Sequence, residues 1–527
     1  MAAGTRGAGA ATPAASGDPT SSCPWGRSNN SRGGGAAYPD TAAHYFTVAI
    51  PAVPGETLTL HGTFPHARYI SFTTYDPKTA AADNVNDQGI VPDAGGVNPY
   101  LADADRTATR RAFTLDVVFG QRPASGAPRN TLYTTSQDGS HIGPAFIVIY
   151  RVYRPDTGRD ETGDGGLPRI TVNDPGGARQ ELAGCPGGPA DAQPDAIGQA
   201  NNKALSGDPL VSSPLQGPGL DPPIWRKFYN LAESLVQGTD NGVVGSAASD
   251  GAQPVAAATG SGGFLQNLDN NYIATVLGAG YGQVVVVHGH VWGYVPTYQR
   301  QPRMAAATLR YWSVCSNEEA TTRVYACLDD DQVVSTGSGD WTLVVSTAAN
   351  RPRNATAACG VNWLPFGAAP DDVLIIRNML AQPGVTGTVQ ATRAGHEVED
   401  LGRYYPRSAY TSTSAFEQLG CVNAQVAATS AGGPPPAGSV ATAGPGGLPN
   451  TAASGSARDA AGALGLLAFA SVMRGARRRH LGPWESRQGR RYSVAGGNAT
   501  VPSSLSSNPG LCATSHGCPS RSRKTPA

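Results

Sequence analysis

Residues 45–62 read YFTVAIPAVPGETLTLHG, and residues 272–289 read YIATVLGAGYGQVVVVHG. The two stretches align without a gap at a separation of 227 positions, and both end in a β-rich run followed by His-Gly. Self-similarity over this distance indicates that a whole structural unit occurs twice in the chain.

The similarity continues beyond the two aligned stretches. Further landmarks recur in the same order, at separations of 226 to 244 positions. These are Arg68-Tyr69-Ile70-Ser71 with Arg310-Tyr311-Trp312-Ser313, Asp87-Gln88 with Asp331-Gln332, Phe113-Thr114-Leu115 with Trp341-Thr342-Leu343, Asn130-Thr131-Leu132 with Asn362-Trp363-Leu364, and IVIYR at 147–151 with VLIIR at 373–377. One match would be chance, but a collinear series indicates a duplication.

Each landmark has the pattern of a β-strand. Residues 57–60 and 284–287 are β-rich runs close to glycine, and residues 69–75 and 113–119 alternate apolar with polar side chains. Short strands separated by Gly, Pro, Asn and Asp turns are typical of a sandwich or jelly roll. We therefore predict a mainly β protein with two tandem, related antiparallel β-sandwich units.

The composition divides the chain into folded units and linkers. One helix is predicted over 222–237, because Pro222 and Pro223 open a segment with Ile224, Phe228, Leu231 and Leu235 on one face. The predicted organisation is a disordered start (1–37), a first unit (38–185), a Gly/Pro/Ala-rich linker with the helix (186–263), a second unit (264–422), a low-complexity spacer (423–459), a short apolar segment with an arginine cluster (460–480) and a disordered tail (481–527).

This order of landmarks resembles the jelly-roll domain of unknown function 1214, and more closely the uncharacterised secreted proteins of actinobacteria that carry two such units. The resemblance covers roughly residues 38–175 and 264–420 and rests on RYxS, the following TL-containing strand, the NxL segment and the final IxR strand. It implies a β-sandwich fold and supplies no catalytic residues. The scarcity of lysine among the basic residues fits a GC-rich bacterial genome, since only Lys78, Lys203, Lys227 and Lys524 occur.

Six of the eight cysteines bracket the β-rich units. Cys23 and Cys185 lie just outside the first unit, while Cys315, Cys327, Cys359 and Cys421 lie within or at the edge of the second. No CxxC pair occurs, which argues against zinc. This placement predicts disulfides in an exported domain, with buried free thiols in a cytosolic protein as the alternative.

The C-terminal region resembles the cell-wall sorting signal of Gram-positive surface proteins. Leu448, Pro449, Asn450, Thr451 and Ala452 form an LPxTG-like motif after a Pro/Gly/Ala spacer, and an apolar stretch (460–473) with arginines follows. The resemblance implies a sortase-type transpeptidase and peptidoglycan as partners, with the arginines retained on the cytoplasmic side. An accidental match in an Ala/Gly/Pro-rich tail is the alternative. The predicted location is extracellular or anchored to the cell wall.

Other features limit the function further. No secretory signal is visible in residues 1–40, so either the true start lies upstream or the protein is not exported. Lys+Arg and Asp+Glu are equal at 39 each, which supplies no excess of positive charge for nucleic-acid binding.

Two groups of side chains are candidates for metal binding. Asp156, Asp160, Glu161 and Asp164 lie together in a glycine-rich loop and offer oxygen ligands of the kind that calcium prefers, with a solvated loop as the alternative. His61, His66, His288 and His290 lie at or near two equivalent strand ends, where histidines two apart share a face, but they lack a third ligand by spacing. Apart from calcium, no cofactor is predicted.

No short catalytic motif occurs, because HExxH, GxSxG, the phosphate loop and the dinucleotide fingerprint are all missing. Trp292, Tyr294 and Tyr298, in an insertion of the second unit, are candidates for stacking on sugar rings, with covering of a sheet edge as the alternative. Two functions stay open: a non-enzymatic binding or structural module with a possible carbohydrate ligand, and an extracellular glycosidase-like hydrolase with a carboxylate pair between the units.

Overall fold

The computed structural model describes residues 23–27, 38–76, 80–185, 220–228, 265–318, 323–393 and 395–423. All of them belong to one compact unit of the chain, Met1–Leu481. The contacts between the two repeats described below therefore lie inside a single unit.

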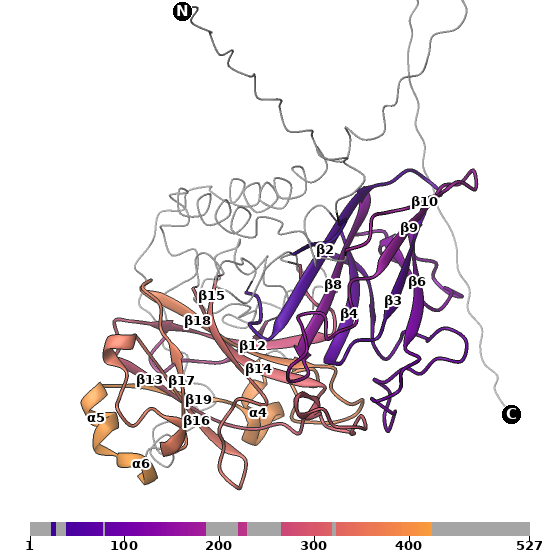
Figure 1. Ribbon diagram of the computed structural model, residues 1–527. Coiled ribbons are helices and arrows are strands. Elements are labelled where there is room, and N and C mark those ends of the chain that lie inside the picture. Colours follow the sequence, from indigo (N-terminus) through magenta and orange to yellow (C-terminus); the bar gives the residue numbers. More distant parts are fainter. Residues whose placement is uncertain are drawn as a thin grey trace, which may run out of the picture. The chain divides into compact units, whose positions relative to one another are not determined.

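The first repeat is built from two five-stranded sheets (Figure 1). One sheet has the order β1-β2-β8-β4-β5, and the other has the order β10-β9-β3-β6-β7. The strands are β1 (Gly26–Arg27), β2 (Ala43–Pro51), β3 (Thr57–Thr63), β4 (Ala67–Tyr75), β5 (Ala81–Asn86), β6 (Ala112–Gln121), β7 (Thr131–Thr135), β8 (Ala145–Pro155), β9 (Arg169–Asn173) and β10 (Arg179–Glu181).

The second repeat has the sheets β11-β12-β18-β14-β15 and β17-β16-β13-β19. Its strands are β11 (Arg226–Phe228), β12 (Asn270–Gly278), β13 (Val284–His290), β14 (Tyr311–Glu318), β15 (Val324–Asp329), β16 (Asp340–Ser346), β17 (Val361–Pro365), β18 (Asp371–Met379) and β19 (Arg407–Thr411). Helices α4 (Glu397–Leu401), α5 (Thr413–Gln418) and α6 (Gly420–Asn423) and the 3-10 turns η2 (Thr297–Gln299), η3 (Ala348–Asn350), η4 (Ala357–Cys359) and η5 (Gly402–Tyr404) lie between or after the strands.

The two repeats share one topology. Strands β2 to β9 correspond in order to β12 to β19, and both repeats contain one parallel pair, β6 with β7 and β16 with β17. All other strand pairs are antiparallel. The predicted mainly β fold of two related sandwiches is confirmed.

Alternation along the strands builds a core between the two sheets of each repeat. In β3, Leu58 and Leu60 are fully buried, whereas Thr57 and Thr59 on the opposite face are half-buried. In β13, Val285 and Val287 occupy the inward positions. Burial of such side chains is the main stabilising contribution to a sandwich of this kind.

The helix predicted over 222–237 is wrong in its described part. Residues Arg226–Phe228 form β11, which pairs antiparallel with β12, and residues 229–237 lie outside the described residues. The first repeat uses the same device, because β1 pairs with β2 through Gly26 and Arg27. A strand forms here in place of the helix because it pairs with the backbone N–H and C=O groups at the edge of a sheet.

The fully buried Trp25 and Trp225 precede these two edge strands and are equivalent. Their indole nitrogens donate to Pro168 O and Ser408 Oγ at the far sheet, at 2.7 Å in both cases. Both folded units therefore include residues that precede their predicted starts, Trp25 in the first unit and Trp225 in the second.

Several predictions fall on residues outside the described part of the chain. These are the sorting motif at 448–452, the apolar stretch with its arginine cluster at 460–480, and the tail that contains Cys512 and Cys518. Among the helices that the structure describes, none has the length and apolar character needed to cross a bilayer.

Candidate functional sites

The first candidate is the contact between the two repeats, which is filled by aromatic side chains. Tyr45, Tyr69 and Tyr153 of the first repeat pack with Tyr311 and Met379 of the second, and all five are buried. The rings of Tyr153 and Tyr311 meet edge to face with centroids 5.4 Å apart. Such a surface is a packed interface and not an open cleft.

Charged side chains cross this interface reciprocally. Arg68 of the first repeat binds both carboxylate oxygens of Asp330, at 2.7 and 2.8 Å, and also contacts Asp331. Its counterpart Arg310 lies 3.2 Å from the carboxylate of Asp87 in the first repeat. Burial raises the pKa of both Asp87 and Asp330 to about 7, and the facing arginines act in the opposite direction.

The backbone contacts of these aspartates revise one sequence match. Asp87 accepts from Ile70 N, and Asp330 accepts from Trp312 N, both at 3.1 Å. Because Ile70 and Trp312 are equivalent, Asp87 corresponds to Asp330. The sequence alignment had matched Asp87 with Asp331. An alignment of two residues, Asp-Gln, could not fix the register of a turn.

A second pair of arginines fastens the start of the opposite repeat. Arg151 donates to Leu265 O at 2.6 Å, and Arg377 donates to Tyr38 O. Tyr38 and Leu265 are the equivalent residues that precede β2 and β12, and both have positive φ. Each repeat therefore holds the chain segment that enters the other repeat.

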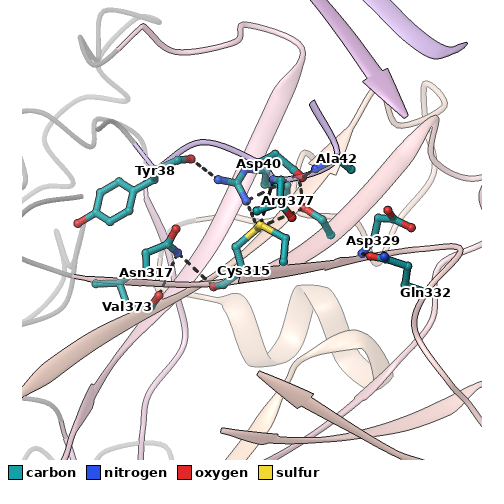
Figure 2. The surroundings of a disulfide bond; sticks show 12 residues. Tyr38, Asp40, Ala42, Cys315, Asn317, Asp329, Gln332, Val373 and Arg377 are labelled. Atoms are coloured by element: carbon teal, nitrogen blue, oxygen red, sulfur yellow. Dashed lines mark hydrogen bonds and ion pairs between the residues drawn. A yellow bond between two sulfur atoms is a disulfide. The ribbon is translucent and has the colours of Figure 1, made fainter. Parts of the chain in front are cut away.

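The Cys315–Cys327 disulfide lies beside one of these arginines (Figure 2). It joins directly opposed residues of β14 and β15, and Arg377 Nη1 lies 2.7 Å from Cys315 Sγ. At the equivalent place in the first repeat, Thr73 Oγ1 donates to Asn84 Oδ1 at 2.6 Å. A covalent link in one repeat thus replaces a hydrogen bond in the other.

Two further disulfides join the remaining four cysteines that were proposed as disulfide partners. Cys23 pairs with Cys185 and ties the start of the first repeat to its end, with Cα atoms 4.8 Å apart. Cys359 pairs with Cys421 and ties η4 to α6. All six cysteines proposed as disulfide partners are therefore linked.

The structure does not bring the four proposed calcium ligands together. Asp156 binds Arg106 through both oxygens at 2.8 Å, Asp164 binds Arg159, and Asp160 Oδ1 accepts from the Thr162 and Asp164 amides. Glu161 points to His44 at 3.8 Å. No three of these four carboxylates come within metal-binding distance of one another in the described residues.

Two other groups of metal-binding side chains do converge in the described part of the chain. One contains Asp40, Cys315 and Cys327, whose sulfurs are already bonded to each other. The other contains Asp329, Asp330 and Asp331, which face Arg68 and Arg154. The ligand atoms of both groups are already engaged, because the two sulfurs form a disulfide, Asp40 accepts from Tyr311 and Ser313, and the other three aspartates pair with arginines.

The histidines do not converge with a third metal ligand in the described residues. His290 Nδ1 lies 2.8 Å from Asp340, and Arg403 contacts the other ring nitrogen. His66 contacts Arg111. Burial, and to a smaller extent the positive charge of Arg111, lower the pKa of His66 to about 4. Burial also lowers the pKa of His288.

Burial excludes Trp292 as a sugar-stacking residue, which corrects that part of the prediction. Trp292 is 1% exposed and stacks on Tyr404 inside the second repeat. Tyr294 and Tyr298 are half-buried, and the guanidinium carbons of Arg68 and Arg154 lie 5.2 and 3.7 Å from their ring centroids. The insertion packs on the first repeat, whose core cluster includes its Val295 and Met304.

The remaining candidate is a hollow on the outer face of the sheet that contains β3 and β6. Its volume is about 500 Å³. Sequence reasoning missed it because its residues come from strands and turns far apart in the chain. The lining residues are Thr57, Thr59, Asp116, Val118, Pro128, Thr131, Tyr133, Asn173, Asp174, Gly177, Ala178 and Arg179.

Comparisons with known proteins show only distant similarity. No family model matches the chain, and no curated protein matches it. Among solved structures, the chain is similar to an uncharacterized protein from Burkholderia cenocepacia at 11% identity and a TM-score of 0.36, covering 72% of this chain and 78% of that one. It is also similar to the VPA0106 protein from Vibrio parahaemolyticus at 10% identity and a TM-score of 0.33, covering 71% of this chain and 90% of that one. At such low values, neither similarity bears on function.

Proposed function

We propose that this protein is exported and acts at the actinobacterial cell surface as a binding module. The packed interface between the two repeats is the observation that favours binding over catalysis. Four carboxylates between the repeats, Asp87, Asp329, Asp330 and Asp331, have side chains no more than 8% exposed and face arginines. A hydrolase needs its acid and base within reach of the substrate, and these groups are out of reach.

Export is supported by the cysteine chemistry. Three disulfides join residues separated by 162, 12 and 62 positions. Disulfides of this number persist in oxidising compartments and are rare in the cytosol. The LPxTG-like motif at 448–452 supports attachment to the wall through a sortase-type transpeptidase.

Intact mass spectrometry of protein recovered from the cell-wall fraction tests this proposal. We expect a chain that ends at Thr451, and we expect Cys23, Cys185, Cys315, Cys327, Cys359 and Cys421 to resist alkylation until a reductant is added. Recovery of the protein only from the cytosol, with all cysteines alkylated without reductant, would contradict export. Hydrolysis of a wall glycan by the purified chain would favour the glycosidase-like alternative.

A further inference from the structure

The outer face of β3 and β6 in the first repeat differs from the equivalent face of β13 and β16 in the second. In the second repeat, Val284, Val286 and Val344 on the outer face of β13 and β16 pack against Phe416 of α5 and are buried. The equivalent positions of the first repeat, from the aligned strands and their registers, are Thr57, Thr59 and Asp116. The face is apolar where it is covered and polar where it forms the hollow.

The cover of the second repeat is firmly attached. Asn354 Nδ2 donates to Phe416 O at 3.0 Å, and Thr413 Oγ1 donates to Asn350 O at 2.9 Å. The Cys359–Cys421 disulfide adds a covalent link. In the first repeat, the hollow is bordered instead by Pro128 on one side and by the turn between β9 and β10 on the other, and none of the described residues fills it.

Polar side chains form a connected row across the floor of the hollow. Thr59 Oγ1 donates to Asp116 Oδ1 at 2.8 Å, and Asn173 Nδ2 donates to Thr59 Oγ1 at 3.0 Å. No group among the described residues donates to Asp116 Oδ2 or Asn173 Oδ1, and the Arg179 guanidinium has no ion-pair partner there. Hydrogen bonds within the row therefore fix its side chains, and Asp116 Oδ2, Asn173 Oδ1 and the Arg179 guanidinium can still bond a ligand.

We propose that this hollow binds a neutral glycan through its hydroxyl groups. The inference deepens the proposed binding function and rests on it. A hydroxyl group both donates and accepts, so neighbouring hydroxyls match a carboxylate, an amide and a guanidinium set side by side. The charged lining residues are Asp116, Asp174 and Arg179, so the lining carries one net negative charge and disfavours a polyanion.

A peptide fits this site less well. Peptides usually add a strand to a sheet edge, where unpaired backbone groups give the affinity. The floor of the hollow is a sheet face, and β3 is already paired on both sides by β6 and β9. Tyr133 gives little stacking surface because it is 7% exposed and has the Arg122 guanidinium 6.0 Å from its ring centroid. Side-chain hydrogen bonds must therefore carry recognition.

Isothermal titration calorimetry of the full chain tests the proposal with short oligosaccharides of a neutral glucan, a mannan and a galactan. A polyuronate and an unstructured Gly/Ser/Thr peptide are the comparison ligands. We expect at least one neutral oligosaccharide to bind, and we expect Asp116→Ala and Asn173→Ala to weaken that binding by roughly 10- to 100-fold. Thr114→Ala is the matched control, because Thr114 lies on the same strand and face as Asp116 but outside the hollow, and it should leave binding unchanged.

A second measurement separates loss of the site from loss of the fold. Amide hydrogen exchange of the wild-type chain should slow in β3 and β6 when the oligosaccharide is added, and not in β13 or β16. Three results would overturn the proposal: no binding of any neutral oligosaccharide, binding of the peptide or polyuronate alone, or equal losses in all three variants. None of these three results would change the expected mass of the wall-bound protein, so they would not contradict export and wall attachment. Retention of the Asp116→Ala chain on isolated cell walls would keep the binding function and place its site elsewhere.

Discussion

The buried charges of this protein divide into two kinds at the scale of single residues. Most face a cationic side chain, either across the interface, as Asp330 faces Arg68, or within one repeat, as Asp156 faces Arg106. Asp372 is different, because it is fully buried at the start of β18 and pairs with no cation among the described residues. Its Oδ2 accepts from Gly367 N at 3.0 Å and from Ser316 Oγ at 3.3 Å. Burial raises the pKa of Asp372 to about 8.

Asp372 should make stability depend on pH. The folded pKa of about 8 lies above the value of 3.8 expected in the unfolded chain. The contribution of Asp372 to stability is therefore fully present below about pH 4 and is lost as the pH rises towards 8. We expect Asp372→Asn to raise the free energy of unfolding near pH 8, relative to wild type, by about 1 to 3 kcal/mol more than near pH 5. Urea unfolding at the two pH values measures this difference, and Asp371→Asn is the control. An equal effect of Asp372→Asn at both pH values would refute it.

At the scale of elements, the paired strands β14 and β15 can be compared with β4 and β5. The first pair carries the Cys315–Cys327 disulfide where the second carries the Thr73–Asn84 hydrogen bond. Thr73 Oγ1 also accepts from Arg151 at 3.1 Å, just as Cys315 Sγ lies beside Arg377. The two residue pairs therefore occupy equivalent positions and have equivalent arginine neighbours.

Exchange of the cysteine pair tests that equivalence. The double variant Cys315→Thr with Cys327→Asn should fold and should lose about 3 kcal/mol of stability under non-reducing conditions, the expected contribution of a link that closes so short a loop. Urea unfolding with and without reductant measures the loss, which should shrink when wild type is reduced. The reverse exchange, Thr73→Cys with Asn84→Cys, should form a new disulfide. A double variant that fails to fold would show that the second repeat needs the covalent bond.

The elements also show what a sequence of this kind can and cannot predict. Internal comparison located the strands because the matching landmarks fall on equivalent strands, β3 with β13 and β8 with β18. It missed β1 and β11 because strands of two and three residues have no detectable alternation. It also placed Trp292 in solvent, since nothing local reveals that an insertion packs against residues far away in the chain. The hollow was unpredictable for the same reason.

At the scale of the whole molecule, reciprocal ion pairs join the two repeats. Arg68→Met would leave the buried Asp330 without its partner, so we expect a loss of about 3 to 5 kcal/mol. Asp330→Asn should also destabilise, and the double variant should lose less than the sum of the two. Arg353→Ala is the control, because Arg353 is 89% exposed in its pair with Glu417, and its loss should change the stability little. Urea unfolding measures all four, and strictly additive losses would show that the pair is not coupled.

The arginines that hold Tyr38 and Leu265 also bear on symmetry. Two identical polypeptides joined through this contact would form a two-fold homodimer, in which every outer surface appears twice and must serve one purpose. Joining both halves in one polypeptide fixes their ratio at one to one and removes that restriction. One half is then free to cover its outer sheet face with helix α5, while none of the described residues covers the matching face of the other half.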